Sequence, residues 1–154
     1  MYIASANGWA DAVAASGLAA FTHVPILLVD GDRIPAATAD ALATLAPTSI
    51  TVVGGRAAVP DSVVDAMHAT RLGGATRYET SDAVAAAAVA AGADATRLWM
   101  ATGADWPDAL TAGPAAAGSG AVLRLVNGVL PQVPGNVKEL VVVGGEAAVR
   151  SATR

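Results

Sequence analysis

Two arginines and a tyrosine stand close together in the middle of the chain. Arg71 and Arg77 flank a glycine pair, and Tyr78 follows directly. Two guanidinium groups at this spacing could offer bidentate hydrogen bonds to one phosphate or carboxylate. The alternative is structural: Arg77 would pair with Glu79, Asp82 or an acid of a neighbouring segment, as arginine does at interfaces, while the tyrosine would fill the core. The residue types alone leave both roles open.

Glycine pairs occur twice in similar surroundings. Gly54-Gly55 and Gly144-Gly145 each follow a run of valines. A glycine after a strand can take a positive φ and let an anion approach the backbone, as phosphate-binding loops do. Neither pair has the Gly-x-Gly-x-x-Gly spacing or the Gly-Lys-Ser/Thr ending of nucleotide-binding loops. Tight turns without a ligand are therefore the alternative.

Two tryptophans are each followed by an aspartate. Trp9 precedes Asp11, and Trp106 precedes Asp108 at the same spacing. An aspartate in the first turn of a helix interacts favourably with the helix dipole, which gives a structural explanation. The functional alternative is a polar contact from the carboxylate to a sugar hydroxyl, with the tryptophan ring as a stacking face.

Catalytic and metal-binding patterns find little support. The chain has no cysteine, which excludes disulfides and thiolate metal sites. His23 and His68 stand apart from any serine or acid in a known signature, and no Gly-x-Ser-x-Gly or His-Glu-x-x-His motif is present. We therefore expect no catalytic residue, no metal site, no cofactor and no enzymatic activity.

Composition excludes several classes of protein. Of the 154 residues, 54% are hydrophobic and 14% are charged, which excludes disorder. The net charge of −4 argues against nucleic-acid binding, which shows a basic footprint. The longest apolar stretch, residues 83–91, is far shorter than the roughly 20 residues that a membrane span needs. No basic flank followed by an apolar segment opens the chain as in a secretory signal, so we expect either a cytoplasmic protein or a piece of a longer one.

The chain contains an internal repeat. The segment beginning at Tyr2 aligns with the segment beginning at Trp99, which places Trp9 on Trp106. Further along, Val-Val-Gly-Gly-x-Ala-Ala-Val occurs at residues 52–59 and again at 142–149. The second copy is shorter in the connection before its last strand. Self-similarity of this kind is typical of proteins built from tandem units.

Hydrophobic runs alternate with alanine-rich stretches along both copies. The runs predict strands, and the stretches predict helices of a length that suits crossover connections. Strands that are apolar throughout fit a parallel sheet covered on both faces. The fold class is therefore α/β with a parallel sheet flanked by helices. Strands are expected at 2–5, 26–29, 50–53, 98–102, 122–126 and 140–143, and helices at 10–21, 36–45, 61–69, 80–91 and 108–117.

One segment makes a family resemblance specific. Residues 71–80 read Arg-Leu-Gly-Gly-Ala-Thr-Arg-Tyr-Glu-Thr, which resembles the opening of the cell-wall-binding repeat, type 2. The later motif Ala-Thr-Gly-x-x-Trp-x-Asp-Ala-Leu at 101–110 and the Gly-Gly after each valine strand are also similar to that family. The resemblance covers nearly the whole chain. It divides the chain into a partial first repeat, residues 1–70, and a second repeat, residues 71–154, that is short at its C-terminal end.

The resemblance implies a function that composition does not show. Such repeats are Rossmann-like or Toprim-like α/β units that commonly occur in threes around a pseudo-threefold axis, on secreted proteins of Gram-positive bacteria. They anchor the protein to the wall at the cell surface without a covalent bond, as S-layer-type proteins are anchored. The implied partners are an anionic wall polymer and neighbouring repeats, or other copies in an oligomer such as a trimer. No nucleic acid and no membrane span are implied.

Two hypotheses of different classes follow. The leading one is a non-catalytic wall-anchoring module in which Arg71, Arg77, Tyr78, the two glycine pairs and the two Trp–Asp pairs contact the polymer. The alternative is an enzyme domain that binds a nucleotide or another small molecule through the glycine-rich strand–helix loops, because this fold class hosts many such functions.

Overall fold

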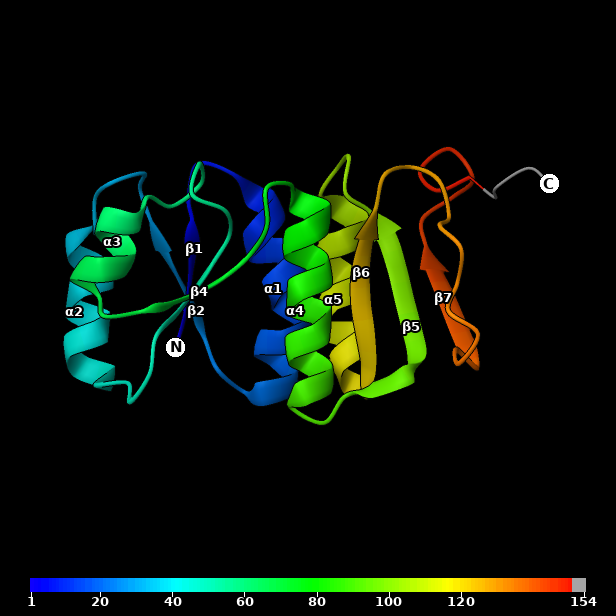
Figure 1. Cartoon of the computed structure of the whole chain (residues 1–154), viewed down its shortest axis with the longest axis horizontal. Coiled ribbons are helices and arrows are strands. Elements are labelled where there is room, and N and C mark those ends of the chain that lie inside the picture. Colours follow the sequence, from blue (N-terminus) through cyan, green and yellow to red (C-terminus); the bar gives the residue numbers. More distant parts are fainter. Residues whose placement is uncertain (151–154) are drawn as a thin grey trace.

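The first repeat builds a parallel sheet from short apolar strands. The computed structural model describes residues 1–150 (Figure 1). Each strand is followed by a helix, of which the first two are rich in alanine, except the last strand, which leads into the second repeat. The elements are β1 (Tyr2–Ser5), α1 (Trp9–Thr22), β2 (Ile26–Val29), α2 (Ala36–Leu45), β3 (Thr51–Val53), α3 (Asp61–Ala66) and β4 (Thr70–Leu72).

The second repeat opens with a helix and then follows the order of the first, except that residues 127–138, between its last two described strands, form no helix. The opening helix is capped by Thr76, whose side chain accepts a hydrogen bond from the Glu79 backbone N–H, as a capping box requires. The elements are α4 (Arg77–Ala90), β5 (Asp94–Thr102), α5 (Pro107–Gly118), β6 (Ala121–Val126) and β7 (Glu139–Val143). The expected α/β class, with parallel sheets flanked by helices in tandem repeats, is confirmed.

Equivalent strands pair in the same register in the two sheets. Their strand orders are β2-β1-β3-β4 and β6-β5-β7, with every pair parallel. Tyr2 pairs with Ile26 and Thr51, and its counterpart Trp99 pairs with Leu123 and Val141. The carboxyl ends of the strands therefore bring equivalent loops of each repeat to the same edge of its sheet.

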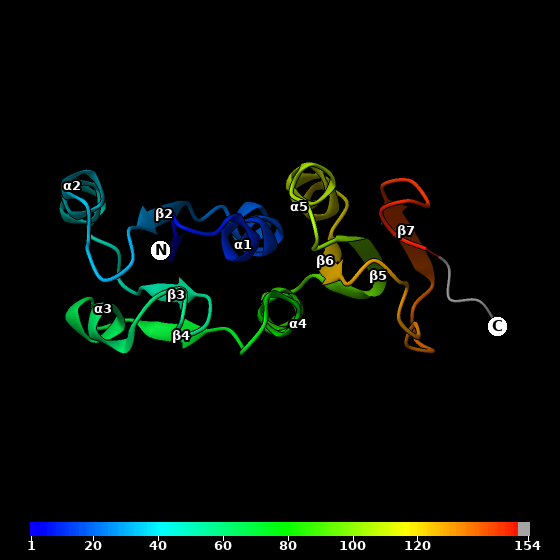
Figure 2. The same ribbon diagram turned by 90° about the horizontal axis from the view of Figure 1, so that it is seen from above.

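Helices α1 and α4 lie between the two sheets (Figure 2). Helix α1 belongs to the first repeat, yet it packs against α4 and α5 of the second. Its Val13 and Leu18 are buried in clusters with Leu123 and Met100 of the second sheet. The repeats therefore share hydrophobic cores, and neither buries its apolar surface alone.

Small residues allow α1 and α5 to approach closely. A Cβ atom on Gly113 would lie 1.8 Å from Ser16 Oγ and 3.1 Å from the Gly17 nitrogen. A Cβ on Gly17 would in turn meet the Gly113 carbonyl oxygen at 3.6 Å. The lack of side chains at this crossing is what permits the two backbones to pack this closely.

Several boundaries differ from those that the sequence predicts. Strand β4 is not predicted, because three residues with one apolar side chain carry no clear period. The first turn of α4 begins at Arg77 rather than residue 80, since its polar residues follow the cap and not a hydrophobic pattern. Helix α3 ends at Ala66, and β5 begins at Asp94. The division between residues 70 and 71 stays a prediction, and β4 crosses it.

Candidate functional site

The N-terminal turn of α4 fixes the Arg-Tyr pair. Glu79 donates its backbone N–H to Thr76 Oγ1 at 3.2 Å, while its carboxylate accepts the backbone N–H of Ala75 at 2.6 Å. These bonds satisfy N–H groups that a helix start leaves without partners. Arg77 and Tyr78 are thereby held in regular helical geometry at the exposed end of the helix.

Arg77 reaches from the second repeat over the first. Its guanidinium lies 5.1 Å from the centroid of the Trp9 ring, and one N–H donates to the Gly103 carbonyl oxygen at 2.7 Å. The guanidinium has five N–H donors. Within residues 1–150 it forms no ion pair with a carboxylate, unlike Arg33, Arg71 or Arg124. A positioned cation therefore remains open to an outside anion.

Tyr78 points to a different surface. Its hydroxyl donates to Asn127 Oδ1 at 3.1 Å, just after β6. A Cβ atom on Gly103 would lie 2.6 Å from the Tyr78 ring. Gly103 therefore positions both side chains: its carbonyl oxygen accepts a hydrogen bond from Arg77, and its lack of a side chain leaves room for the Tyr78 ring. Sequence reasoning missed Gly103 and Asn127 as site residues, although Gly103 stands in the Ala-Thr-Gly motif that carries the resemblance.

Asp11 occupies the first turn of α1, as the sequence predicts. Its Oδ2 atom lies 2.6 Å from where a Cβ of Gly54 would stand, and Gly54 has a φ of +125°. Both features require glycine at this position. Burial raises the pKa of the Asp11 carboxyl, while the Thr80 hydroxyl and the positive charge of Arg77 partly oppose that rise.

The Gly54-Gly55 pair packs against Gly73-Gly74, which precede the Arg-Tyr turn of α4. A Cβ on Gly55 would lie 2.5 Å from the Gly74 carbonyl oxygen, and a Cβ on Gly73 would lie 2.6 Å from the carbonyl carbon of Gly54. Two backbones thus pack directly against one another. This contact is an alternative to the open anion-binding loop that the sequence also allowed, and the anion role of Gly54 and Gly55 stays a prediction.

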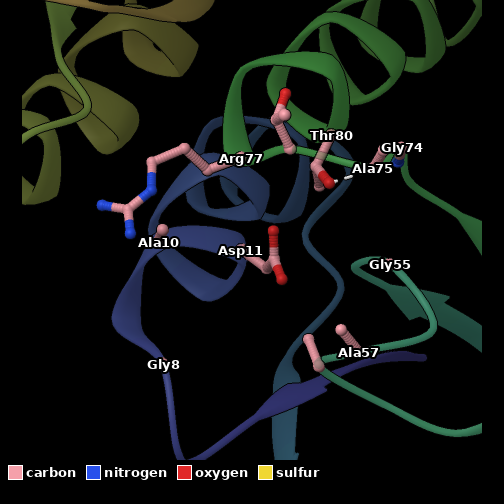
Figure 3. Close-up of a pocket in the computed structure, with 11 residues that line it drawn as sticks. Gly8, Ala10, Asp11, Gly55, Ala57, Gly74, Ala75, Arg77 and Thr80 are labelled. Carbon is pink, nitrogen blue, oxygen red and sulfur yellow. Dashed lines mark hydrogen bonds between the residues drawn. The ribbon is translucent and has the colours of Figure 1, made fainter.

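A pocket of about 190 Å³ opens beside this contact (Figure 3). Its walls come from the start of α1, the turn after β3 and the segment from Gly74 to Thr80, so both repeats build it. In Figure 3 the Asp11 carboxylate points into the space facing Gly55, while the Arg77 side chain extends past Ala10. We call this space the junction pocket. It is lined by the Asp11 carboxylate and the buried Thr80 hydroxyl, and at its edge by Arg77, whose guanidinium extends toward Trp9 and Gly103.

Arg71 lies behind the glycine contact. Its guanidinium donates to the carbonyl oxygens of Gly54 and Val59 at 2.8 and 2.7 Å, and to Asp61 at 2.9 Å. The side chain is 19% exposed. These contacts hold the turn after β3 in place. They correspond to the structural alternative, and a ligand role for Arg71 stays a prediction.

The second copy of these residues forms only half of such a pocket. Asp108 Oδ2 lies 2.5 Å from where a Cβ of Gly144 would stand, which repeats the geometry of the first copy. Among residues 1–150, however, no atom lies within 4 Å of the corresponding position on Gly145. Trp106 and Leu110 are 50% and 46% exposed. These residues gather at the start of α5, separately from the junction pocket.

No group of three or more histidine, aspartate or glutamate side chains in residues 1–150 is arranged to hold a metal ion. None of the described helices is long and apolar enough to cross a membrane.

The chain is similar to two solved structures, Cwp6 and Cwp8 from Clostridium difficile. Cwp6 shares 27% sequence identity with a TM-score of 0.83, over 96% of this chain and 25% of that one. Cwp8 shares 27% identity with a TM-score of 0.72, over 96% of this chain and 27% of that one. The chain therefore spans about a quarter of the length of each. No curated protein matches it.

The family described as cell wall binding domain 2 (CWB2) matches residues 1–64 and 71–154. These ranges include the start of α1, both glycine pairs and the Arg-Tyr turn of α4. The sequence resemblance is therefore confirmed, and the chain belongs to the CWB2 family.

Proposed function

We propose that this chain is a non-catalytic module that anchors an attached protein by binding an anionic wall polymer without a covalent bond. Membership of the CWB2 family implies cell wall binding. The proposal adds the charge of the ligand, the absence of chemistry on it and the place where it binds, which is the junction pocket. We also infer secretion and anchoring of the S-layer type, because a wall ligand lies outside the cell.

The single observation that carries this proposal is the state of Arg77. Its guanidinium is positioned by Gly103 and Trp9 at the edge of the junction pocket, and it has no carboxylate partner within residues 1–150. Charge-assisted hydrogen bonds from arginine to phosphate or carboxylate are strong and can be bidentate. Because the guanidinium is already held in place, an anion binds it at a reduced entropic cost.

The Asp11 carboxylate favours a glycan, rather than an inorganic anion, as the ligand of the junction pocket. A half-buried carboxylate with a raised pKa, close to an arginine and in a pocket, is a candidate functional group. Ionised, it accepts hydrogen bonds only, so it suits sugar hydroxyls and repels a second anion. The junction pocket would thus contact one charged substituent through Arg77 and one neighbouring hydroxyl through Asp11.

The half pocket at the start of α5 supports a second part of the proposal. Trp106, Asp108, Gly144 and Gly145 would contact polymer once a neighbouring repeat, or another copy in an oligomer such as a trimer, covers Leu110 as α4 covers α1. Several such sites along one polymer would add through effective concentration.

A pulldown with purified wall sacculi tests the proposal. The protein is incubated with sacculi before and after chemical removal of their anionic polymer, at low and high salt. We expect retention on intact sacculi, little retention on stripped ones, and a loss at high salt because exposed charges are screened. Arg77→Ala should weaken retention by about 10- to 150-fold, since one charge-assisted contact is worth roughly 1.5–3 kcal/mol.

Arg33→Ala is the matched control. Arg33 is an exposed arginine of the first repeat that is already paired with Asp30, so its loss removes the same charge away from the junction pocket. Equal retention of Arg77→Ala and Arg33→Ala would contradict the proposal. A thermal shift with nucleotides or sugar phosphates, without retention on sacculi, would favour the enzyme alternative instead.

A further inference from the structure

We propose that the second repeat carries a separate subsite for a neutral sugar, on the other side of the Arg77–Tyr78 pair from the junction pocket. The inference rests on the proposed function, because it names a second part of the same polymer as the ligand. The subsite is a pocket of about 510 Å³ between the first turns of α4, the end of β6 and the loop that follows. We call it the β6 pocket.

The β6 pocket exists because the second repeat lacks a helix that the first repeat has. In the first repeat, α2 follows β2 and packs onto it, with the Thr38 hydroxyl donating to the Leu28 carbonyl oxygen at 2.6 Å. In the second repeat, residues 127–138 run from β6 to β7 without a helix, as the shorter connection predicts. Figure 1 shows this segment as an irregular loop between the two strands. Leu125 and Val126 at the end of β6 are buried, but Asn127, which follows them, is exposed to the pocket, at the edge of the sheet where open α/β folds commonly bind ligands.

The polar groups of the pocket leave hydrogen-bonding capacity unused. Tyr78 donates to Asn127 Oδ1, which leaves the tyrosine oxygen as an acceptor and the Asn127 amide as a donor. Arg124 pairs with Asp82 through contacts of 2.7 and 2.6 Å. Their charges cancel, so this pocket has no free cation comparable to Arg77. A neutral ligand with hydroxyl groups fits these donors and acceptors.

The remaining wall is apolar. Val129 is 45% exposed, and Leu130 and Pro131 line the pocket beside it. A pyranose ring has one polar edge of hydroxyls and an apolar face of C–H bonds, so it can use both walls at once. Sites for small ligands generally combine an apolar lining with a few placed polar groups. The β6 pocket has this composition at the size of a sugar unit or two.

The Arg-Tyr pair then serves two sites from one helical turn. Arg77 faces the junction pocket and Tyr78 faces the β6 pocket, and Gly103 holds both. A polymer lying across the start of α4 would place a charged substituent on Arg77 and a neutral ring on Tyr78. Alternation of charged and neutral groups along the polymer would match this spacing and increase affinity through effective concentration.

The test is a nuclear magnetic resonance titration of the full chain labelled with ¹⁵N. The probes are two neutral disaccharides, maltose and diacetylchitobiose, and one anion, glycerol phosphate. We expect at least one disaccharide to shift the side-chain amide signals of Asn127 and the Nε signal of Arg124, with little change at Gly55. Glycerol phosphate should instead shift signals around the junction pocket.

Two variants and a control decide the role of the pocket. Asn127→Asp keeps an acceptor for Tyr78 but removes the amide donor, and we expect it to weaken disaccharide binding about tenfold, as the loss of one placed hydrogen bond predicts. Tyr78→Phe should weaken it by a similar factor. Gln132→Ala, an exposed position of the same loop outside the pocket, should bind as the parent does.

Failure of this inference differs from failure of the proposed function. Absence of shifts at Asn127 with both disaccharides, or unchanged binding by Asn127→Asp, would overturn the β6 pocket whatever Arg77→Ala does on sacculi. Conversely, unchanged retention of Arg77→Ala together with disaccharide shifts at Asn127 would overturn the anionic junction site and leave the neutral subsite standing.

Discussion

The starts of α1 and α5 are the same structure in two different surroundings. Each has a tryptophan, an aspartate in the first turn and a glycine pair beside it. At α1 the second repeat covers this arrangement: Val13 is 7% exposed, and Arg77 lies over Trp9. At α5 the corresponding Leu110 is 46% exposed. A repeat therefore supplies half of a pocket, and the junction between repeats supplies the whole.

This difference changes what counts as the binding unit. If polymer is bound where repeats meet, the number of polymer-binding sites equals the number of junctions between repeats and not the number of Trp–Asp motifs. Damage to the interface should then abolish binding even where every proposed ligand contact is kept. The following variants separate the two copies, beginning with the one that should have the largest effect.

Gly113→Ala should disrupt the junction most. The Cβ atom added at residue 113 would lie 1.8 Å from Ser16 Oγ and 3.0 Å from Ser16 Cβ. Rotating the serine hydroxyl away would therefore not remove the overlap, because Ser16 Cβ would still be too close. Forcing a methyl group into a packed interface typically costs about 1–3 kcal/mol. We expect a lower midpoint of urea unfolding and weaker retention on sacculi.

Gly118→Ala is the control on the same helix. No atom of residues 1–150 lies within 4 Å of its added Cβ, so the helix preference of alanine should leave stability unchanged or raise it by up to about 1 kcal/mol. If both variants unfolded at the same urea concentration, close packing of α1 on α5 would not hold the repeats together.

Gly55→Ala should have the next largest effect. Its Cβ would stand 2.5 Å from the Gly74 carbonyl oxygen, which is backbone and cannot rotate away. The two glycine segments would have to separate, at a cost of about 1–2 kcal/mol, and the junction pocket would widen. Thermal unfolding measures the loss, and retention on sacculi measures the change in the pocket.

Gly145→Ala makes the same change in the second copy. Nothing in residues 1–150 lies within 4 Å of the added methyl group, so the chain should keep its stability. A similar loss of stability in both variants would show that the glycine pairs act through their own turns and not through the contact between repeats.

The contrast between the copies also explains how much the sequence could predict. Aligning the repeats and following their hydrophobic runs correctly predicts the parallel sheets and most of α4, because hydrophobic periods are local. Tertiary packing, in contrast, sets the pairing of Arg71 with Asp61. It also sets the contacts of α4 with Gly103 and Asn127, which follow strands β5 and β6. Such contacts leave no periodic signal in a single sequence.

Asp11→Asn should have the smallest effect on stability and the opposite sign. Burial raises the pKa of Asp11, so the folded protein binds this proton more tightly than the unfolded chain does. Below the ordinary pKa of 3.8 the group is protonated in both states, and the cost of ionising it appears only as the pH rises through the higher folded value. Asparagine removes that cost, so the variant should be slightly more stable than the parent at neutral pH, with the difference shrinking as the pH falls.

The same variant should bind polymer less well, because the amide no longer offers two carboxylate oxygens to sugar hydroxyls. Asp108→Asn is the matched control in the monomeric chain: it changes the same helix position at α5, where no neighbouring repeat completes the pocket, so we expect retention of the monomer on sacculi to equal that of the parent. A more stable but weaker-binding Asp11→Asn would mean that a destabilising carboxylate is kept at the junction for its ligand. If Asp11→Asn lost stability at neutral pH and kept full retention, the carboxylate would be a helix-start group and the pocket would need another acceptor.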